Sequence, residues 1–126
     1  MAGLQKRILI VEDDGEVRAM IGSALRQRGL TVDEAPGGQE AIDLVRENRY
    51  AVILLDLLMP HPDGFAVLDE LDSPQSLPVV LVVIGADRSV IDQLDSQRIH
   101  GVVRKPFDPD DLAALVVACS EIRARG

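Results

Sequence analysis

The sequence is poor in three features that often announce a function. It contains one cysteine, no tryptophan, one tyrosine and two phenylalanines. A single cysteine cannot form an internal disulfide, which excludes a disulfide-stapled scaffold. The aromatic residues are too few for a platform on which nucleic-acid bases stack. No apolar run approaches the roughly 20 residues that span a bilayer, so a transmembrane helix is not expected.

Positive charge is also in short supply. The chain has 13 Lys and Arg residues against 21 Asp and Glu residues, which gives a formal net charge of −8 and an isoelectric point near 4.6. This balance disfavours direct binding to the phosphates of nucleic acid. Cys119 falls within a helical apolar pattern, and we interpret it as a core residue rather than a nucleophile. A reduced thiol of this kind fits a cytoplasmic location.

What remains is the composition of an ordinary folded domain. The 126 residues are 47% apolar and 27% charged, which argues against disorder. The length is close to that of one typical domain. We therefore predict that residues 1–126 form a single domain.

Apolar runs and helical patterns alternate along the chain. Most of the runs lack polar alternation, which is typical of strands buried on both faces of a parallel sheet. The stretch 30–35 does alternate, and we expect it to lie near an edge. The predicted strands are Ile8–Val11, Leu30–Ala35, Ala51–Leu55, Val79–Ile84 and Gly101–Val103.

Helix signals fill the gaps between these strands. Gly29 is placed to end the first helix, and Asp108 with Pro109 is a strong start for the last one. A weaker, polar helix is predicted for Ser89–Gln97. The apolar faces of the first and last helices are predicted to hold Val17, Met20, Ile21, Ala24 and Leu25, and Leu112, Leu115, Val116, Cys119 and Ile122. This order of elements predicts an α/β fold, a single doubly wound five-stranded parallel sheet with helices on both faces, (βα)5.

Charged residues that could bind a ligand or react lie at the ends of three predicted strands: Glu12 and Asp13, Asp56, and Lys105. In a parallel sheet these ends lie side by side, so the side chains should converge on one crevice. Converging carboxylates repel one another, and a hard cation such as Mg²⁺ would relieve the repulsion. Lys105 could hold an anion there. A carboxylate beside both can act as the nucleophile in phosphoryl transfer, although Asp56 could instead merely cap a turn.

Four short motifs carry a resemblance to a known family. They are IVEDD after the first strand, LLDLLMP around Asp56, Asp63-Gly64, and RKPF at 104–107. Their order, the strand and helix count and the length resemble the receiver domain of bacterial two-component response regulators. The resemblance covers nearly the whole chain and implies a flavodoxin-like fold.

The resemblance also implies roles at the site. Asp56 would be the phosphoacceptor, Asp13 a direct Mg²⁺ ligand, and Glu12 an acid that acts through water. The backbone carbonyl of Leu58 would be a further ligand, and Lys105 would contact the phosphoryl group. The partner would be a sensor histidine kinase or a phosphotransfer protein, without direct contact to nucleic acid or membrane.

Several other polar residues near these motifs receive plainer interpretations. Pro106 would fix the loop after Lys105, often through a cis peptide. We interpret Asp14 and Asp63 as helix caps, and His61 and His100 as residues without a chemical role.

The pattern departs from the family at the conformational switch. Receivers usually carry Ser or Thr at the end of the fourth strand, where this chain offers Val83 or, in another alignment, Gly85. Neither side chain can donate a hydrogen bond. The usual aromatic residue of the fifth strand is replaced by Val102. The acceptor chemistry is thus expected to be intact and the switch muted.

Two hypotheses follow. The first is a Mg²⁺-dependent phosphoacceptor signalling domain, not an enzyme acting on external substrates. The alternative is a pseudo-receiver, an interaction module regulated without phosphorylation. A hydrolase with an Asp nucleophile is disfavoured, because the place of its second catalytic Asp holds Leu58. The face around Val102 could serve a homodimer or an output domain.

Overall fold

The computed structural model describes residues 7–57, 64–71, 79–84 and 99–125. Its strands are β1 (Arg7–Val11), β2 (Thr31–Ala35), β3 (Val52–Asp56), β4 (Val79–Ile84) and β5 (Gly101–Arg104). Its helices are α1 (Gly15–Arg26), α2 (Gly38–Glu47), α3 (Gly64–Glu70) and α4 (Pro109–Arg125). The helix predicted for Ser89–Gln97 lies outside the described residues.

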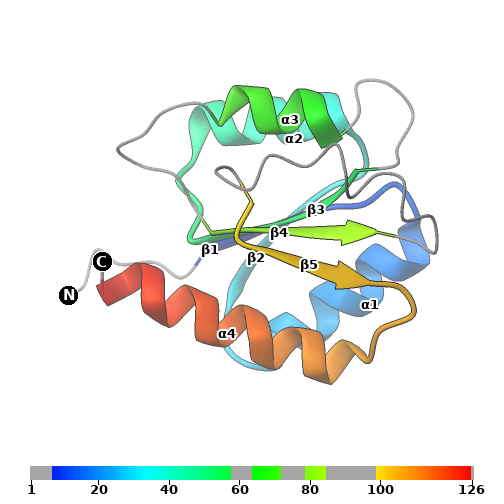
Figure 1. Ribbon diagram of the computed structural model, residues 1–126, viewed down its shortest axis with the longest axis vertical. Helices are drawn as coiled ribbons and strands as arrows, with labels where there is room; N and C mark the ends of the chain where they lie inside the picture. Colours follow the sequence, from blue (N-terminus) through cyan, green and yellow to red (C-terminus); the bar gives the residue numbers. More distant parts are fainter. Residues whose placement is uncertain (1–6, 58–63, 72–78, 85–98, 126) are drawn as a thin grey trace.

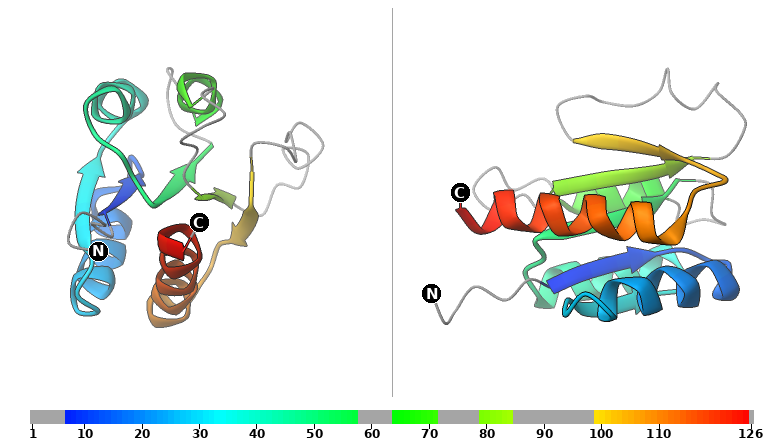
Figure 2. Two further views of the ribbon diagram at one scale, coloured as in Figure 1. Left: turned by 90° about the vertical axis from the view of Figure 1, so that its left-hand side faces the viewer. Right: turned by 90° about the horizontal axis from the view of Figure 1, so that it is seen from below.

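The strands form one parallel five-stranded sheet in the order β2-β1-β3-β4-β5. Helices α2 and α3 cover one face of the sheet, and α1 and α4 cover the other (Figures 1 and 2). The fold predicted from the alternation of strands and helices is confirmed. None of the helices in the described part of the chain has the length and apolar character needed to cross a membrane.

Apart from Arg7 at the start of β1 and Asp56 at the end of β3, the central strands β1, β3 and β4 are apolar because each face of the sheet has its own core. Leu9, Ile53 and Val80 pack with residues of α2 and α3. Their strand neighbours Ile8 and Leu54 point the other way and pack with residues of α1 and α4. Burial of each large aliphatic side chain is worth about 1.5–3 kcal/mol. Two cores therefore hold the sheet in place from both sides and leave its carboxyl edge for polar residues.

Both ends of α1 are set by local signals that the sequence predicted. The Asp14 carboxylate accepts the backbone N–H groups of Glu16 and Val17, at 2.9 and 3.2 Å, and so caps the helix. Gly29 has φ +82°, the left-handed conformation that favours glycine. Its N–H donates to the Arg26 carbonyl, and the following N–H, of Leu30, donates to the Leu25 carbonyl. These two bonds close the helix and turn the chain into β2.

The start of α4 is likewise confirmed, since the Asp108 carboxylate accepts the N–H groups of Asp110 and Asp111. Two predicted core positions are wrong. Met20 in α1 and Leu115 in α4 are 43% and 42% exposed. In α4 the buried stripe instead runs through Leu112, Ala113, Val116 and Ser120. Leu115 lies outside that stripe because side chains of a helix point in successive directions around its axis, and position 115 falls toward solvent.

The edge strand β2 carries acidic residues that point to opposite faces. Asp33 Oδ2 accepts hydrogen bonds from Arg7 Nη1 at 2.9 Å and from the Tyr50 hydroxyl at 2.7 Å. Glu34 lies beside α1, where it pairs with Arg18 and Arg26. Both carboxylates thus fasten β2 to its neighbours.

The opposite edge is joined through a histidine. The N–H of Val80 in β4 donates to His100 Nδ1 at 3.0 Å, and the His100 N–H donates to the Val80 carbonyl at 2.9 Å. These bonds pair the residue before β5 with β4. The structural interpretation of His100 agrees with this arrangement, whereas His61 and Asp63 lie outside the described residues.

Candidate functional site

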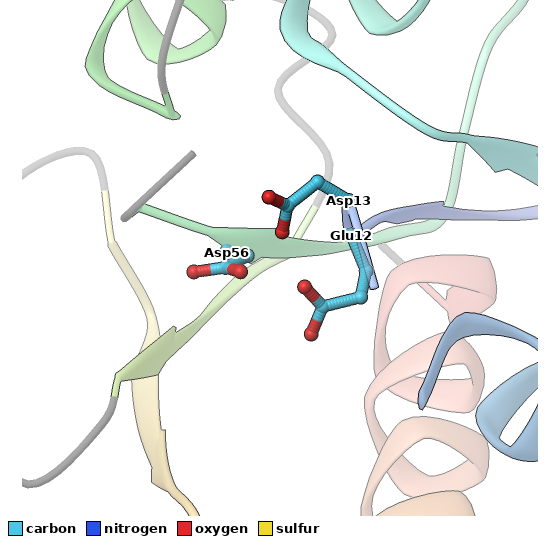
Figure 3. Close-up of side chains that lie close together, drawn as sticks. All are labelled: Glu12, Asp13 and Asp56. Atoms are coloured by element: carbon cyan, nitrogen blue, oxygen red, sulfur yellow. The ribbon is translucent and has the colours of Figure 1, made fainter. Parts of the chain in front are cut away.

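Strands β1 and β3 bring three carboxylates together at the carboxyl edge of the sheet. Val11 and Leu55 are paired across the two strands, and the next residues are Glu12 and Asp56. Oxygen atoms of Glu12, Asp13 and Asp56 all lie within 4.8 Å of one another. Figure 3 shows the three side chains gathered beside the end of β3. The convergence predicted from the strand ends is therefore present.

Lys105 joins this cluster from the end of β5. Its Nζ lies 2.9 Å from Glu12 Oε1 and 3.9 Å from Asp56 Oδ2. The peptide bond between Lys105 and Pro106 is cis, as the resemblance implied. Carboxylates still outnumber the ammonium group, so the cluster carries excess negative charge. That Glu12 is the nearest carboxylate to Lys105 was not evident from any motif.

Glu12 is held from several sides although its side chain is almost fully buried, at 2% exposure. Its N–H donates to the Ala35 carbonyl, and its carbonyl accepts from Arg18 Nη1 at 2.8 Å. The N–H of Asp14 donates to Glu12 Oε2 at 3.4 Å. Because these partners come from α1, β2 and the loop between β1 and α1, the position of Glu12 is fixed by tertiary structure.

The charges of the cluster shift its protonation. Burial raises the pKa of Glu12, and so do the hydrogen bond and the negative charge of Asp56, against the opposing effect of Lys105. For Lys105, burial acts to lower the pKa, but Glu12, Asp56 and Asp13 together raise it above its ordinary value. Lys105 is thus held as a cation, while Glu12 resists losing its proton.

The donor set fits a hard divalent cation. All three groups offer carboxylate oxygens, with no His or Cys among them. Mg²⁺ prefers such oxygens and keeps several waters and phosphate oxygens in its remaining positions. An added cation would also relieve the excess negative charge that raises the pKa of Glu12. The residues present therefore suit Mg²⁺.

The start of α3 lies directly against the strand end that carries Asp56. Gly64 is buried, and a Cβ added to it would come within 2.7 Å of both the Asp56 carbonyl oxygen and the Leu57 Cα. Backbone atoms cannot yield as a flexible side chain can. Gly64 is therefore required for the close approach of α3 to Asp56, a reason that the motif Asp63-Gly64 did not reveal.

The expected switch positions are only partly described. Val83 pairs with Asp56 across β3 and β4 and is buried, so an aliphatic side chain lies beside the cluster on this strand. Val102 in β5 is 43% exposed. Gly85, the other candidate for the hydroxyl position, and Leu58, the expected backbone ligand, lie outside the described residues.

Comparison with known proteins decides the family. Residues 8–117 match the family model described as the response regulator receiver domain. The chain belongs to this family. Receiver domains are the phosphoacceptor signalling modules of two-component systems.

The relatives agree with this assignment. The transcriptional regulatory protein SrrA of Staphylococcus aureus (strain NCTC 8325) is 33% identical over 116 residues, which make up 91% of this chain and 48% of SrrA. This receiver chain thus spans about half the length of the curated relatives that it matches. SrrA from strain COL matches equally, at 33% over 116 residues.

Solved structures show the same fold. The receiver domain of the Francisella response regulator 1452 is 26% identical with a TM-score of 0.81, covering 94% of this chain and 98% of that one. The response regulator TrrA from Thermotoga maritima, solved in complex with Mg²⁺ and BeF, is 27% identical with a TM-score of 0.78, covering 91% of this chain and 99% of that one.

Proposed function

We propose that Asp56 accepts a phosphoryl group from a phosphohistidine on a sensor histidine kinase or a phosphotransfer protein, in a reaction that depends on Mg²⁺. The observation that carries the proposal is the placement of Asp56. It ends the central strand β3 at 7% exposure, within 4.8 Å of Glu12 and Asp13 and 3.9 Å from the Lys105 ammonium. No other Asp among the described residues combines these neighbours.

The ligand roles that we propose are those that the resemblance to receiver domains implies. We assign Asp13 and Asp56 as direct Mg²⁺ ligands, Glu12 as a ligand through water, and the backbone carbonyl of Leu58 as a further ligand. The exposed Asp13 supports this division, since a solvent-facing carboxylate can meet a hydrated ion. Bound Mg²⁺ would neutralise negative charge on the phosphoryl oxygens and so lower the barrier to attack by an anion.

The chemical step transfers the phosphoryl group from the donor imidazole to the Asp56 carboxylate. An oxygen of the Asp56 carboxylate attacks phosphorus, and the bond from phosphorus to the donor imidazole nitrogen breaks. The electron pair of that bond stays on the imidazole, and the phosphoryl charge is retained on Asp56 as an acyl phosphate. Lys105, kept cationic by the cluster, pairs with a phosphoryl oxygen. Its ammonium has three N–H donors, so it can pair with a phosphoryl oxygen as well as with Glu12 Oε1, from which it is separated by 2.9 Å.

The competing assignments have less support. A pseudo-receiver would be expected to have lost part of this constellation, yet the three carboxylates and Lys105 are all present. Turnover of an external substrate is disfavoured by Leu58, which stands where a second catalytic Asp is needed. We therefore propose a signalling module that catalyses only its own phosphorylation and dephosphorylation, working in the cytoplasm. The exposed Val102 marks a face that could receive a second copy or an output domain.

A mass measurement tests the acceptor. Incubation with acetyl phosphate and Mg²⁺ should add the mass of one phosphoryl group, and Asp56→Asn should abolish the addition. Asp43→Asn is the matched control, because Asp43 is an exposed carboxylate of α2 that accepts a hydrogen bond from Gln39 and does not belong to the acidic cluster. Label that persists in Asp56→Asn would show that another residue is the acceptor.

Metal dependence is tested separately. Asp13→Ala should weaken Mg²⁺ binding and slow phosphorylation, because it removes one of the two direct carboxylates. EDTA should stop phosphorylation of the wild-type protein. Phosphorylation that continues unchanged in EDTA would show that the carboxylate cluster serves another purpose.

A further inference from the structure

Arg18 of α1 connects the acidic cluster to Glu34 of β2, and it has no part in the proposed chemistry. Its Nη1 donates to the carbonyl oxygen of Glu12 at 2.8 Å. That carbonyl belongs to the peptide group joining Glu12 to Asp13. A hydrogen bond to it fixes the plane of this peptide and hence the direction in which Asp13 leaves the backbone.

The guanidinium is itself held in place. Arg18 Nε lies 3.5 Å from Glu34 Oε1, and Arg26 Nη1 lies 2.8 Å from Glu34 Oε2. Arg26 also donates to the Val32 carbonyl at 3.1 Å. Glu34 therefore bridges two arginines of one helix, and the largely buried Arg18 has little freedom to leave the Glu12 carbonyl.

Two opposite effects on metal binding can be separated. As a positive charge near the cluster, Arg18 repels a divalent cation. As a donor to the Glu12 carbonyl, it holds the carboxylate-bearing backbone in one geometry. Removing a residue that is hydrogen-bonded to a metal ligand typically changes affinity by about 10- to 100-fold. Arg18 acts on the neighbouring peptide and not on a ligand atom, so an effect at the lower end of this range is expected. The screened repulsion of a side chain bonded to the opposite charge of Glu34 is expected to be weaker.

We propose that Arg18 is a positioning residue for the Mg²⁺-binding carboxylates, acting through the peptide between Glu12 and Asp13. This inference rests on the proposed Mg²⁺-dependent function. Its consequence has a definite sign. Removing a cation from an acidic site should tighten Mg²⁺ binding if charge alone mattered, whereas loss of positioning weakens it.

The test compares Arg18→Ala with Arg26→Ala, a matched control that breaks an ion pair with the same Glu34 but has no bond to Glu12. Mg²⁺ affinity is measured by calorimetric titration of the metal-free proteins, and folding by thermal unfolding. We expect Arg18→Ala to raise the Kd for Mg²⁺ about tenfold. Arg26→Ala should change it less than about twofold, because it removes only a screened charge.

Phosphorylation by acetyl phosphate separates positioning from a damaged acceptor. In Arg18→Ala the Mg²⁺ concentration for half-maximal rate should rise, while the rate at saturating Mg²⁺ stays close to that of wild type. Arg18→Lys, which retains one donor for the carbonyl, should recover part of the affinity and provides the readout if the alanine variant unfolds.

Each outcome is decisive. Tighter or unchanged Mg²⁺ binding in Arg18→Ala, or equal losses in Arg18→Ala and Arg26→Ala, would overturn the role of Arg18. Mg²⁺ affinity in Arg18→Lys as low as in Arg18→Ala would also count against it, because lysine retains a donor for the Glu12 carbonyl. If wild type itself binds no Mg²⁺, the proposed function fails instead.

Discussion

Glu12 is a buried acidic residue and Asp33 a partly buried one, and their surroundings differ. Asp33 faces two donors, the Arg7 guanidinium and the Tyr50 hydroxyl. Although burial opposes it, these hydrogen bonds lower the pKa of Asp33. Glu12 faces Asp56 as well as Lys105, and burial together with Asp56 raises its pKa. Deeper burial and a neighbouring carboxylate therefore distinguish Glu12 from Asp33, which has no second carboxylate among its hydrogen-bond partners.

The difference distinguishes structural acids from reactive ones. Asp33 is satisfied within the protein, and it stabilises the edge strand β2. Around Glu12 the described residues supply fewer cations than anions, so a cation from solution would offset the excess negative charge. A buried carboxylate with a raised pKa beside a second carboxylate is therefore the feature that points to the site, and the following experiments test it.

The largest effect is expected at Gly64, where the cluster depends on close backbone contact. Gly64→Ala places a Cβ 2.7 Å from the Asp56 carbonyl oxygen, so α3 or the end of β3 must move. Overpacking of this kind costs about 1–3 kcal/mol, and phosphorylation should fall sharply. Gly22→Ala is the control, since the atoms nearest to its Cβ would be the side-chain ends of Arg26 and Glu34, at 3.0 Å, which can shift. Urea unfolding and phosphorylation by acetyl phosphate report both effects; equal behaviour of the two variants would contradict the assignment.

A second comparison neutralises Glu12 in the acidic cluster and Asp33 in the edge strand β2. Asp33→Asn should lower the free energy of unfolding by about 1–2 kcal/mol, because charge-assisted hydrogen bonds are lost from a site partly exposed to water. Glu12→Gln in Mg²⁺-free buffer should cost less than Asp33→Asn or even stabilise the protein, since it removes repulsion from Asp56. Chemical denaturation of both variants is the measurement. A larger loss of unfolding free energy in Glu12→Gln than in Asp33→Asn would contradict the distinction between Glu12 and Asp33.

The pH dependence should show the same contrast in sign. Folding lowers the pKa of Asp33, so its stabilisation is present above the unfolded value of about 4 and is lost as the pH falls through the folded pKa. The stability difference between wild type and Asp33→Asn should therefore shrink in acid. Folding raises the pKa of Glu12, so its unfavourable contribution at neutral pH disappears as the pH falls through that raised pKa. We expect the free energy of unfolding of the wild type, measured from pH 7 downward, to fall relative to that of Asp33→Asn and to rise relative to that of Glu12→Gln.

The smallest expected effect concerns the switch. With Val83 beside Asp56, a phosphoryl oxygen lacks a side-chain donor from that position of β4, and such a bond to a charged group is worth about 1.5–3 kcal/mol. Beryllofluoride, a phosphoryl mimic, should move amide signals of β4 and β5 only slightly in wild type and further in Val83→Thr. The wild-type acyl phosphate should also be long-lived, because Val83 cannot orient an attacking water. Large wild-type shifts, or a phosphate lifetime of seconds, would contradict this prediction.

The local parts of this structure could be predicted from the sequence. Asp14 and Asp108 cap helices as expected, and the apolar runs indicated the strands, because both signals act within a few residues. Parallel topology then brought Asp56 to Glu12. The exposed Met20 and Leu115 were misplaced, since periodicity alone does not say which apolar residues of a wide stripe meet the sheet.

Long-range polar contacts escaped prediction. The bond from Arg18 to the Glu12 carbonyl and the pairing of Lys105 with Glu12 depend on how helices and strand ends sit in space. No spacing in the sequence encodes these contacts. The steric need for Gly64 was hidden for the same reason, since the motif named the residue but not the backbone that it meets.

The strand order has a mechanical consequence. Strand β3, which carries Asp56, is hydrogen bonded to β1 on one side and β4 on the other. Strand β5, which leads to Lys105, is paired with β4 alone among the described strands. The two strands that carry Asp56 and lead to Lys105 therefore differ in stiffness. A phosphoryl group that attracts the Lys105 ammonium would pull on β5, the more flexible of these two strands. Displacement caused by phosphorylation should accordingly be larger in β5 than in β3. The structural change would therefore be found mainly at the outer edge of the sheet.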